Sequence, residues 1–180
     1  SAVFHFPVLT HTMQMMRSFV LFLACATTAT AITEAEGMTL ATDFLASIST
    51  GFKANDMSAQ KQMMAQDVGW DWSGGVKGAG PQADFFKLME GSWQAVVSDF
   101  LPTNVFSVVD TAQNKIATSF EVTLNIDGRG AGPVCLFTGR NMFTITVDND
   151  NKITYFGGLW DANNAAMNAC LASAMPKQEL

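Results

Sequence analysis

The sequence predicts an α+β domain in which helices come first and a long antiparallel meander of strands follows. Apolar residues recur at helical spacing in the first part, whereas alternating apolar and polar residues, separated by turn signals, fill the second part. This order of elements is typical of the α+β class. The chain has 180 residues, 48% hydrophobic and 14% charged, which suits one domain with a real core and is unlike a disordered chain.

The amino-terminal segment is expected to lie outside this domain. Residues 13–31 have the order of a cleaved secretory signal, with Arg17 as the positive charge, an apolar run at 18–26 and small residues at 29–31. The alternative is a buried first helix or strand. The run is shorter than the roughly 20 residues that span a bilayer, so no stable membrane span is expected after cleavage. Residues 1–12 precede the signal as a leader or as added residues.

Removal of this segment changes the inventory of chemical groups. His5, His11 and Cys25 all lie within it, so the remaining chain has no histidine and keeps only Cys135 and Cys170. This excludes serine–histidine and cysteine–histidine catalysis and a zinc site of the usual cysteine and histidine kind. With a formal charge of −6, the chain lacks the excess of positive side chains that would neutralise a row of phosphates. We therefore expect no metal, no cofactor and no nucleic-acid partner.

The carboxyl-terminal tail, 175–180, also bears on the compartment. It ends in Lys-Gln-Glu-Leu, which is similar to the KDEL retention signal, although coincidence in an exposed tail is the alternative. The predicted localisation is the secretory pathway, either secreted or retained in the endoplasmic reticulum lumen. In an oxidising compartment Cys135 and Cys170 form either a disulfide or two buried free thiols, and the sequence leaves both open.

Helical spacing predicts three helices before the sheet. The first covers 38–54 and is capped by Thr39 or Thr42. The second begins at Asp56 as its N-cap, and its methionines are more typical of core packing than of a ligand site. The third covers 82–99 and carries a broad apolar face.

The remaining elements are strands and a final helix. Turn signals and alternation place them at 68–72, 104–110, 114–126, 133–147, 152–161 and, for the helix, 162–174. In 116–126 every second residue is apolar except Thr118, and this alternation predicts one buried face. Asn141 is the polar exception on the apolar face of its strand. These elements set the domain at 38–174, after a short linker at 32–37.

Two stretches resemble the nuclear transport factor 2-like (NTF2-like) superfamily, which includes ketosteroid isomerase and the SnoaL-like polyketide cyclases. Residues 51–72, GFKANDMSAQKQMMAQDVGWDW, are similar to the opening of that family, and 139–161, GRNMFTITVDNDNKITYFGGLWD, to its ending. The resemblance implies a cone-shaped, curved antiparallel sheet wrapped around the N-terminal helices, an NTF2-like or cystatin-like α+β barrel with a deep pocket. It specifies fold much better than function.

The resemblance also indicates where the chemical groups of relatives would fall. Counting along the chain puts the isomerase base at Trp72, its phenolic donor at Ile48 and the pocket aspartate of SnoaL-like proteins at Gly158. None of these residues carries an acid or a base. A one-residue bulge would reverse any of these faces, because side chains alternate along a strand.

The sequence thus predicts a pocket with an aromatic lining. Its expected ligand-binding residues are Trp70, Trp72, Asn141, Phe143, Phe156 and Trp160. Simple core packing is the alternative for the aromatic residues, and backbone hydrogen bonding is the alternative for Asn141.

Three residues are candidates for catalysis: Asp71, Asp161 and Tyr155. Asp71 would act as a base only if a bulge turned it inward, and it is otherwise a solvated residue. Asp161 is also suited to capping the final helix, and Tyr155 has the same ambiguity.

Three hypotheses for function follow. The first is a SnoaL-like domain of the secretory pathway that encloses a small hydrophobic molecule in an apolar pocket. The second is a cofactor-free isomerase, cyclase or dehydratase with an aspartate base. The third is a structural or oligomerisation module. Glu121 and Arg140 occupy the polar faces of neighbouring strands, where they pair across the sheet or at the interface of a homodimer formed through the outer sheet face.

Overall fold

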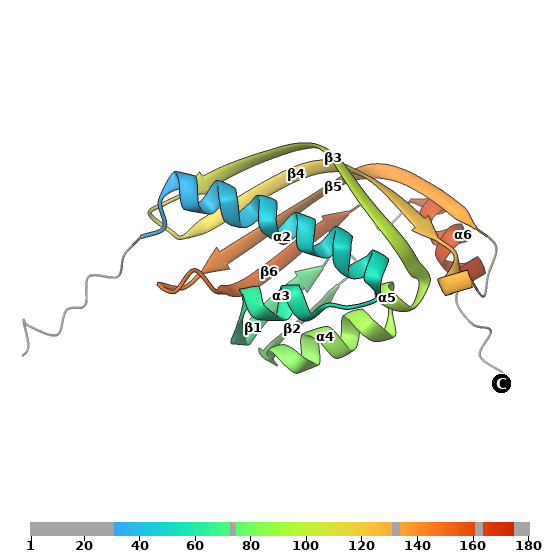
Figure 1. Cartoon of the computed structure of the whole chain (residues 1–180), viewed down its shortest axis with the longest axis horizontal. Helices are drawn as coiled ribbons and strands as arrows, with labels where there is room; N and C mark the ends of the chain where they lie inside the picture. The colour runs from blue at the N-terminus through green and yellow to red at the C-terminus, as the bar shows by residue number, and fades with distance from the viewer. Residues whose placement is uncertain (1–30, 73–74, 131–133, 161–163, 175–180) are drawn as a thin grey trace, which may run out of the picture. The chain divides into compact units, whose positions relative to one another are not determined.

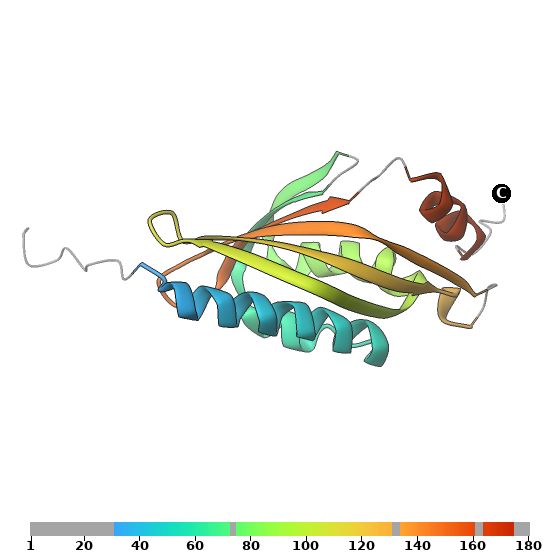
Figure 2. The same ribbon diagram turned by 90° about the horizontal axis from the view of Figure 1, so that it is seen from above.

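A strongly curved six-stranded sheet arches over a group of helices in the computed structural model (Figure 1, Figure 2). It describes residues 31–72, 75–130, 134–160 and 164–174. The helices are α2 (Glu34–Ala54), α3 (Ser58–Met63), α4 (Gln82–Gly91), α5 (Trp93–Val96) and α6 (Ala165–Ala174). The strands are β1 (Met64–Trp72), β2 (Val76–Pro81), β3 (Val97–Asp110), β4 (Lys115–Ile126), β5 (Cys135–Val147) and β6 (Ile153–Trp160).

The sheet has the order β2-β1-β6-β5-β4-β3. All neighbouring strands are antiparallel except β1 and β6, which run parallel. This confirms the predicted α+β class and the meander of its second half. Register shifts in β3, one of them between Thr103 and Phe106, mark bulges of the kind that bend a strand.

The long helix α2 begins earlier than the sequence suggests, and the expected linker at 32–37 is wrong. Ile32 is 3% exposed, and its backbone N–H donates to Asn114 Oδ1 in the β3–β4 turn over 3.0 Å. Thr33, rather than Thr39 or Thr42, is the N-cap. Its Oγ1 accepts from the Glu36 N–H, while Glu36 Oε2 accepts from the Thr33 N–H at 2.9 Å.

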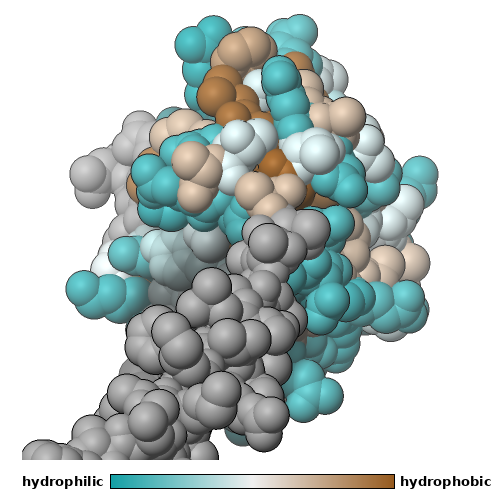
Figure 3. Space-filling view, turned by 90° about the vertical axis from the view of Figure 1, so that its left-hand side faces the viewer, coloured by the Kyte–Doolittle hydropathy of each residue, from teal (hydrophilic) through white to brown (hydrophobic). Residues whose placement is uncertain are grey.

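This reciprocal capping box satisfies two donors of the first helical turn. Hydrogen bonds from Thr33 lower the pKa of Glu36 below its ordinary value. The end of the domain at which α2 begins presents mainly hydrophilic residues, with only small hydrophobic areas (Figure 3). The polar turns of the β3–β4 and β5–β6 hairpins lie at this end (Figure 1).

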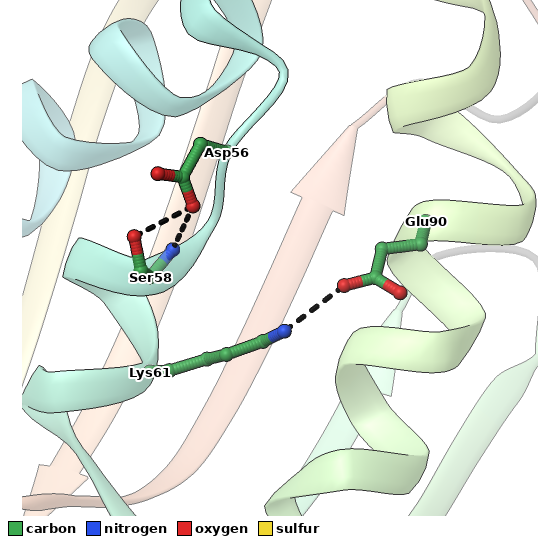
Figure 4. A network of polar contacts seen from close by, with 4 residues as sticks. All are labelled: Asp56, Ser58, Lys61 and Glu90. Atoms are coloured by element: carbon green, nitrogen blue, oxygen red, sulfur yellow. Dashed lines mark hydrogen bonds and ion pairs between the residues drawn. The ribbon is translucent and has the colours of Figure 1, made fainter.

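Polar contacts fix the short helix α3 between α2 and α4 (Figure 4). Asp56 was expected to be the N-cap, but Met57 occupies that position. Asp56 Oδ1 instead accepts hydrogen bonds from the Ser58 backbone N–H at 2.9 Å and from its hydroxyl at 2.6 Å, and these bonds lower the pKa of Asp56. Lys61 Nζ lies 3.0 Å from Glu90 Oε1, so an ion pair joins α3 to α4.

The predicted third helix at 82–99 is too long. The structure has two shorter helices in its place, α4 and the single turn α5. Strand β3 then starts at Val97, whereas the sequence predicted this strand at 104–110. Ser92 departs from helical geometry with φ −122° and ψ −87°. Pro102 lies within β3, which is an edge strand, where a missing backbone donor is tolerated. The other edge strand, β2, was not predicted, because nearly all its residues are exposed and its sequence shows no alternation of apolar and polar side chains.

The alternation in β4 is confirmed. Its residues at even positions from Ile116 to Ile126 are all buried, and they face the helices from the centre of the sheet. On the opposite face Glu121 lies beside Arg140 of β5, with 3.8 Å between Oε1 and Nε, so the expected pairing across the sheet is present. Both side chains are solvent-exposed, and such a pair contributes little to stability.

A disulfide joins the start of β5 to the last helix. Cys135 and Cys170 are bonded, and their Cα atoms are 5.7 Å apart, within the usual range for a cystine. Of the two outcomes that the sequence left open, the disulfide is therefore the one present. It holds α6 against β5 and β4 at one end of the sheet (Figure 2). Among the described residues no helix has both the length and the apolar character needed to cross a membrane.

Candidate functional site

A cavity of about 100 Å³ lies between the concave face of the sheet and helices α2, α4 and α5. It sits toward the C-terminal ends of α2 and β6. Its walls are mostly aromatic and aliphatic residues from these helices and from five strands. Met142 and Leu159 border the cavity, although their side chains are partly exposed and belong to the outer register of β5 and β6. The lining consists of Ile48, Phe52, Trp72, Met89, Trp93, Phe100, Phe120, Leu124, Asn141, Met142, Phe143, Phe156, Gly158 and Leu159.

The aromatic side chains of the wall support one another. The ring centroid of Phe156 lies 5.6 Å from that of Phe44, 6.0 Å from that of Phe143 and 6.4 Å from that of Trp72. Most of these pairs are edge-on or tilted, the geometry that the ring quadrupoles favour. The interlocked rings therefore give the cavity a wall of fixed shape.

Four of the six predicted ligand-binding residues meet at this cavity: Trp72, Asn141, Phe143 and Phe156. The three positions that the resemblance pointed to, Ile48, Trp72 and Gly158, also line it. The register of β1 and β6 is parallel here, with Trp72 opposite Gly158. The chain thus has no acid or base at the three positions where the resemblance would place one.

Trp70 is on the same side of β1 but is not part of the lining. Its indole lies over Gly78 of β2, where an added Cβ would come within 2.5 Å of the ring, and it packs 5.8 Å from Phe85 between centroids. The absence of a side chain at Gly78 lets the indole turn toward the sheet edge. Trp160 ends β6 opposite Asn141, but its side chain lies outside the described part of the structure.

The catalytic candidates do not meet at the cavity. Asp71 is exposed, on the face of β1 opposite to the buried Val68 and Trp72. In the sheet it pairs with Lys77 of the edge strand β2. Tyr155 is 37% exposed and belongs to the outer register of β6. Asp161 lies outside the described residues. Among the described lining residues there is no carboxylate.

Asn141 supplies the only side-chain amide of the described lining. It is half-buried in β5 and shares the inward register of Phe143, while its neighbours in the ladder are Phe120 and the backbone of Trp160. No other described residue forms a hydrogen bond with its side chain. The amide is therefore free to donate to or accept from a molecule in the cavity.

Sequence reasoning missed several lining residues. Phe52 and Met89 were recognised only as parts of apolar helix faces. Phe100 was assigned to no element, because it falls between the predicted helix at 82–99 and the predicted strand at 104–110. Helical spacing identifies the buried face of a helix, but it does not tell which part of that face borders an empty space.

A second, polar hollow lies beside the turn Gly128–Gly130. Arg129 Nε donates to the Gln94 carbonyl oxygen over 2.9 Å, and burial lowers the pKa of Arg129, an effect that nearby Asp127 opposes. In the described ranges no three histidine, cysteine, aspartate or glutamate side chains are grouped in a way that could hold a metal ion.

Comparison with known proteins identifies the fold. No protein-family model and no curated protein matches the chain. Among solved structures, PrhC from Penicillium brasilianum is similar with a TM-score of 0.61 and 18% identity, over 79% of this chain and 94% of that one. A candidate polyketide cyclase from Pseudomonas putida has a TM-score of 0.56 at 17% identity, over 71% and 93%.

A nuclear transport factor 2-like protein from Burkholderia xenovorans has a TM-score of 0.56 at 17% identity, over 77% of this chain and 98% of that one. At such identities the likeness concerns architecture. The chain therefore has the nuclear transport factor 2-like α+β fold that also occurs in polyketide cyclases, as its sequence predicts.

Proposed function

We propose that this domain binds a small hydrophobic molecule in the cavity between its sheet and helices. The observation that carries the proposal is the lining itself, an aromatic wall with one unengaged amide at Asn141. Ligand sites are commonly apolar hollows with a few polar groups that set orientation. Burial of apolar ligand surface contributes about 25 cal/mol per Å², and one hydrogen bond from Asn141 adds about 1 kcal/mol.

Binding is favoured over catalysis by the absence of an acid or base in the described lining. One of the solved structures with a similar fold is a candidate polyketide cyclase. In this chain, however, catalysis by Asp71 would require its exposed side chain to leave solvent and move to the other face of the sheet. Binding requires no such movement.

Ethylbenzene is a suitable probe because it is a small apolar molecule whose single flat ring can pack against the aromatic lining. We expect the wild-type protein to bind it in calorimetric titration. The substitution Leu124→Trp, which fills the cavity, should weaken binding at least tenfold. Thr123→Trp is the matched control, because it adds the same side chain one residue away on the opposite face of β4. Equal binding by both variants, or none by the wild type, would contradict the proposal.

We propose further that the domain works in the secretory pathway after cleavage behind Ala31. Two observations support this proposal. The residues that directly follow the predicted cleavage site are part of the fold, since Ile32 is buried and Thr33 caps α2. The disulfide between Cys135 and Cys170 is of a kind that persists in oxidising compartments.

A homodimer through the outer sheet face is also proposed. Three exposed apolar side chains, Phe106, Met142 and Leu159, lie in one row across the sheet, connected through Ser119. Adjacent to this row, Glu121 and Arg140 offer opposite charges on a single surface. A two-fold axis brings such a surface against its own copy, so that each charge meets its opposite.

Native mass spectrometry of the protein from its own source tests both proposals together. We expect a chain that begins at Ile32 and a particle of twice that chain's mass. A chain that retains residues 1–31 would refute the compartment. A monomer at micromolar concentration would refute the dimer.

A further inference from the structure

We propose that Gln60 is a second recognition residue of this cavity, whose side-chain oxygen accepts a hydrogen bond from a hydroxyl group of the ligand. The proposal rests on the proposed binding function and narrows the ligand class. It implies an apolar ring compound with a hydrogen-bond donor at its inner end, a phenol or an alcohol. Neither the sequence pattern nor the resemblance pointed to this residue.

The side chain of Gln60 is almost completely buried but only half satisfied. The residue is 2% exposed, and its Nε2 donates to the Ser47 carbonyl oxygen of α2. Its Oε1 is buried and has no hydrogen-bond partner within the described part of the chain. Because Nε2 is engaged by a carbonyl, the orientation of the amide is set and the acceptor is the group left over. A buried acceptor without a partner is unfavourable, and a ligand donor would relieve this.

The free oxygen belongs to a residue that lines an inner chamber of about 30 Å³. This volume is enough for a water molecule or a hydroxyl group. The chamber shares four lining residues with the main cavity: Ile48, Phe52, Met89 and Phe156. Met89 has a flexible side chain, so a small shift of it would join the two spaces. A ring in the main cavity would then direct a substituent toward Gln60.

The backbone of α2 is shaped to admit this amide. Gly51 lies beneath it, and a Cβ at that position would collide with Gln60 Nε2 and come within 3.1 Å of Oε1. Glycine within a helix is disfavoured by its conformational freedom, so its presence at this close approach leaves room that any other residue would fill. Gln60 and Asn141 thus provide two polar points in an otherwise apolar enclosure.

The test compares three probes of similar size: 4-ethylphenol, ethylbenzene and 4-ethylanisole, whose oxygen carries no hydrogen. We expect the wild type to prefer 4-ethylphenol over 4-ethylanisole in calorimetric titration. The substitution Gln60→Met keeps the length of the side chain but removes the acceptor. It should reduce the preference for 4-ethylphenol over ethylbenzene about tenfold and leave the affinity for ethylbenzene nearly unchanged.

Gln94→Met is the matched control. Gln94 is also buried, at 6% exposed, and its Oε1 also lacks a partner among the described residues, but it lines the polar hollow beside Arg129. We expect this variant to keep the wild-type preference. Should Gln60→Met fail to fold, the comparison of 4-ethylphenol with 4-ethylanisole in the wild type decides, and equal affinities would overturn the inference.

The outcomes separate this inference from the proposed function. If ethylbenzene binds but the preference for the phenol is unchanged in Gln60→Met, the inference is wrong and the binding function stands. If that preference disappears in Asn141→Leu instead, Asn141 is the acceptor and the inference is again wrong. If the wild type binds none of the three probes, both proposals fail.

Discussion

Replacement of Phe143 by alanine is expected to lower the free energy of unfolding by about 3–5 kcal/mol. The side chain is 2% exposed, and its ring centroid lies 5.7 Å from that of Phe44 and 5.8 Å from that of Phe120. Truncation removes the buried ring and leaves a void that its interlocked neighbours cannot close. Urea unfolding, followed by circular dichroism, measures the loss.

Phe106→Ala is the matched control for this prediction. Phe106 is also an aromatic residue of the sheet, but it is 67% exposed on the outer face. For protein diluted until it is monomeric, so that the proposed dimer surface is free, we expect a change within about 0.5 kcal/mol, as is usual for surface substitutions. A loss below about 1 kcal/mol for Phe143→Ala would show that the aromatic wall is loosely packed, contrary to the structure.

Loss of the disulfide is the second large effect. Cys135→Ala together with Cys170→Ala should lower the free energy of unfolding by about 3–4 kcal/mol, because the bridge closes a loop with a sequence separation of 35 and thereby limits the unfolded chain. The double variant and the wild type are compared by urea unfolding, each with and without a reductant.

The reductant provides the control within the same experiment. Wild-type protein treated with it should approach the stability of the double variant, while the variant itself should not respond. A wild type that is equally stable with and without reductant would mean that the bridge contributes nothing. Because α6 contacts few elements other than β5 and β4, we expect its loosening to precede global unfolding.

Much of the fold was predictable because period-2 alternation leaves little choice. In β4 the apolar residues could occupy only one face, and the structure buries that face. Errors arose where short-range patterns agree with two structures. Val96 and Val97 fit either the end of an apolar helix or the start of a strand, and only pairing with β4 decides that β3 begins at Val97. Exposed β2 has no pattern at all and exists because β1 offers it hydrogen bonds.

The candidate site shows the same division. The sequence by itself determined that the positions at Trp72, Ile48 and Gly158 carry no acid or base, and that Asn141 is the polar residue on an apolar strand face. Only the tertiary structure decided which apolar residues border empty space. Cavities arise from how side chains of distant segments fail to fill a volume, and no local period records that. For the same reason the unpaired oxygen of Gln60 became visible only once α2, α3 and α4 enclosed it.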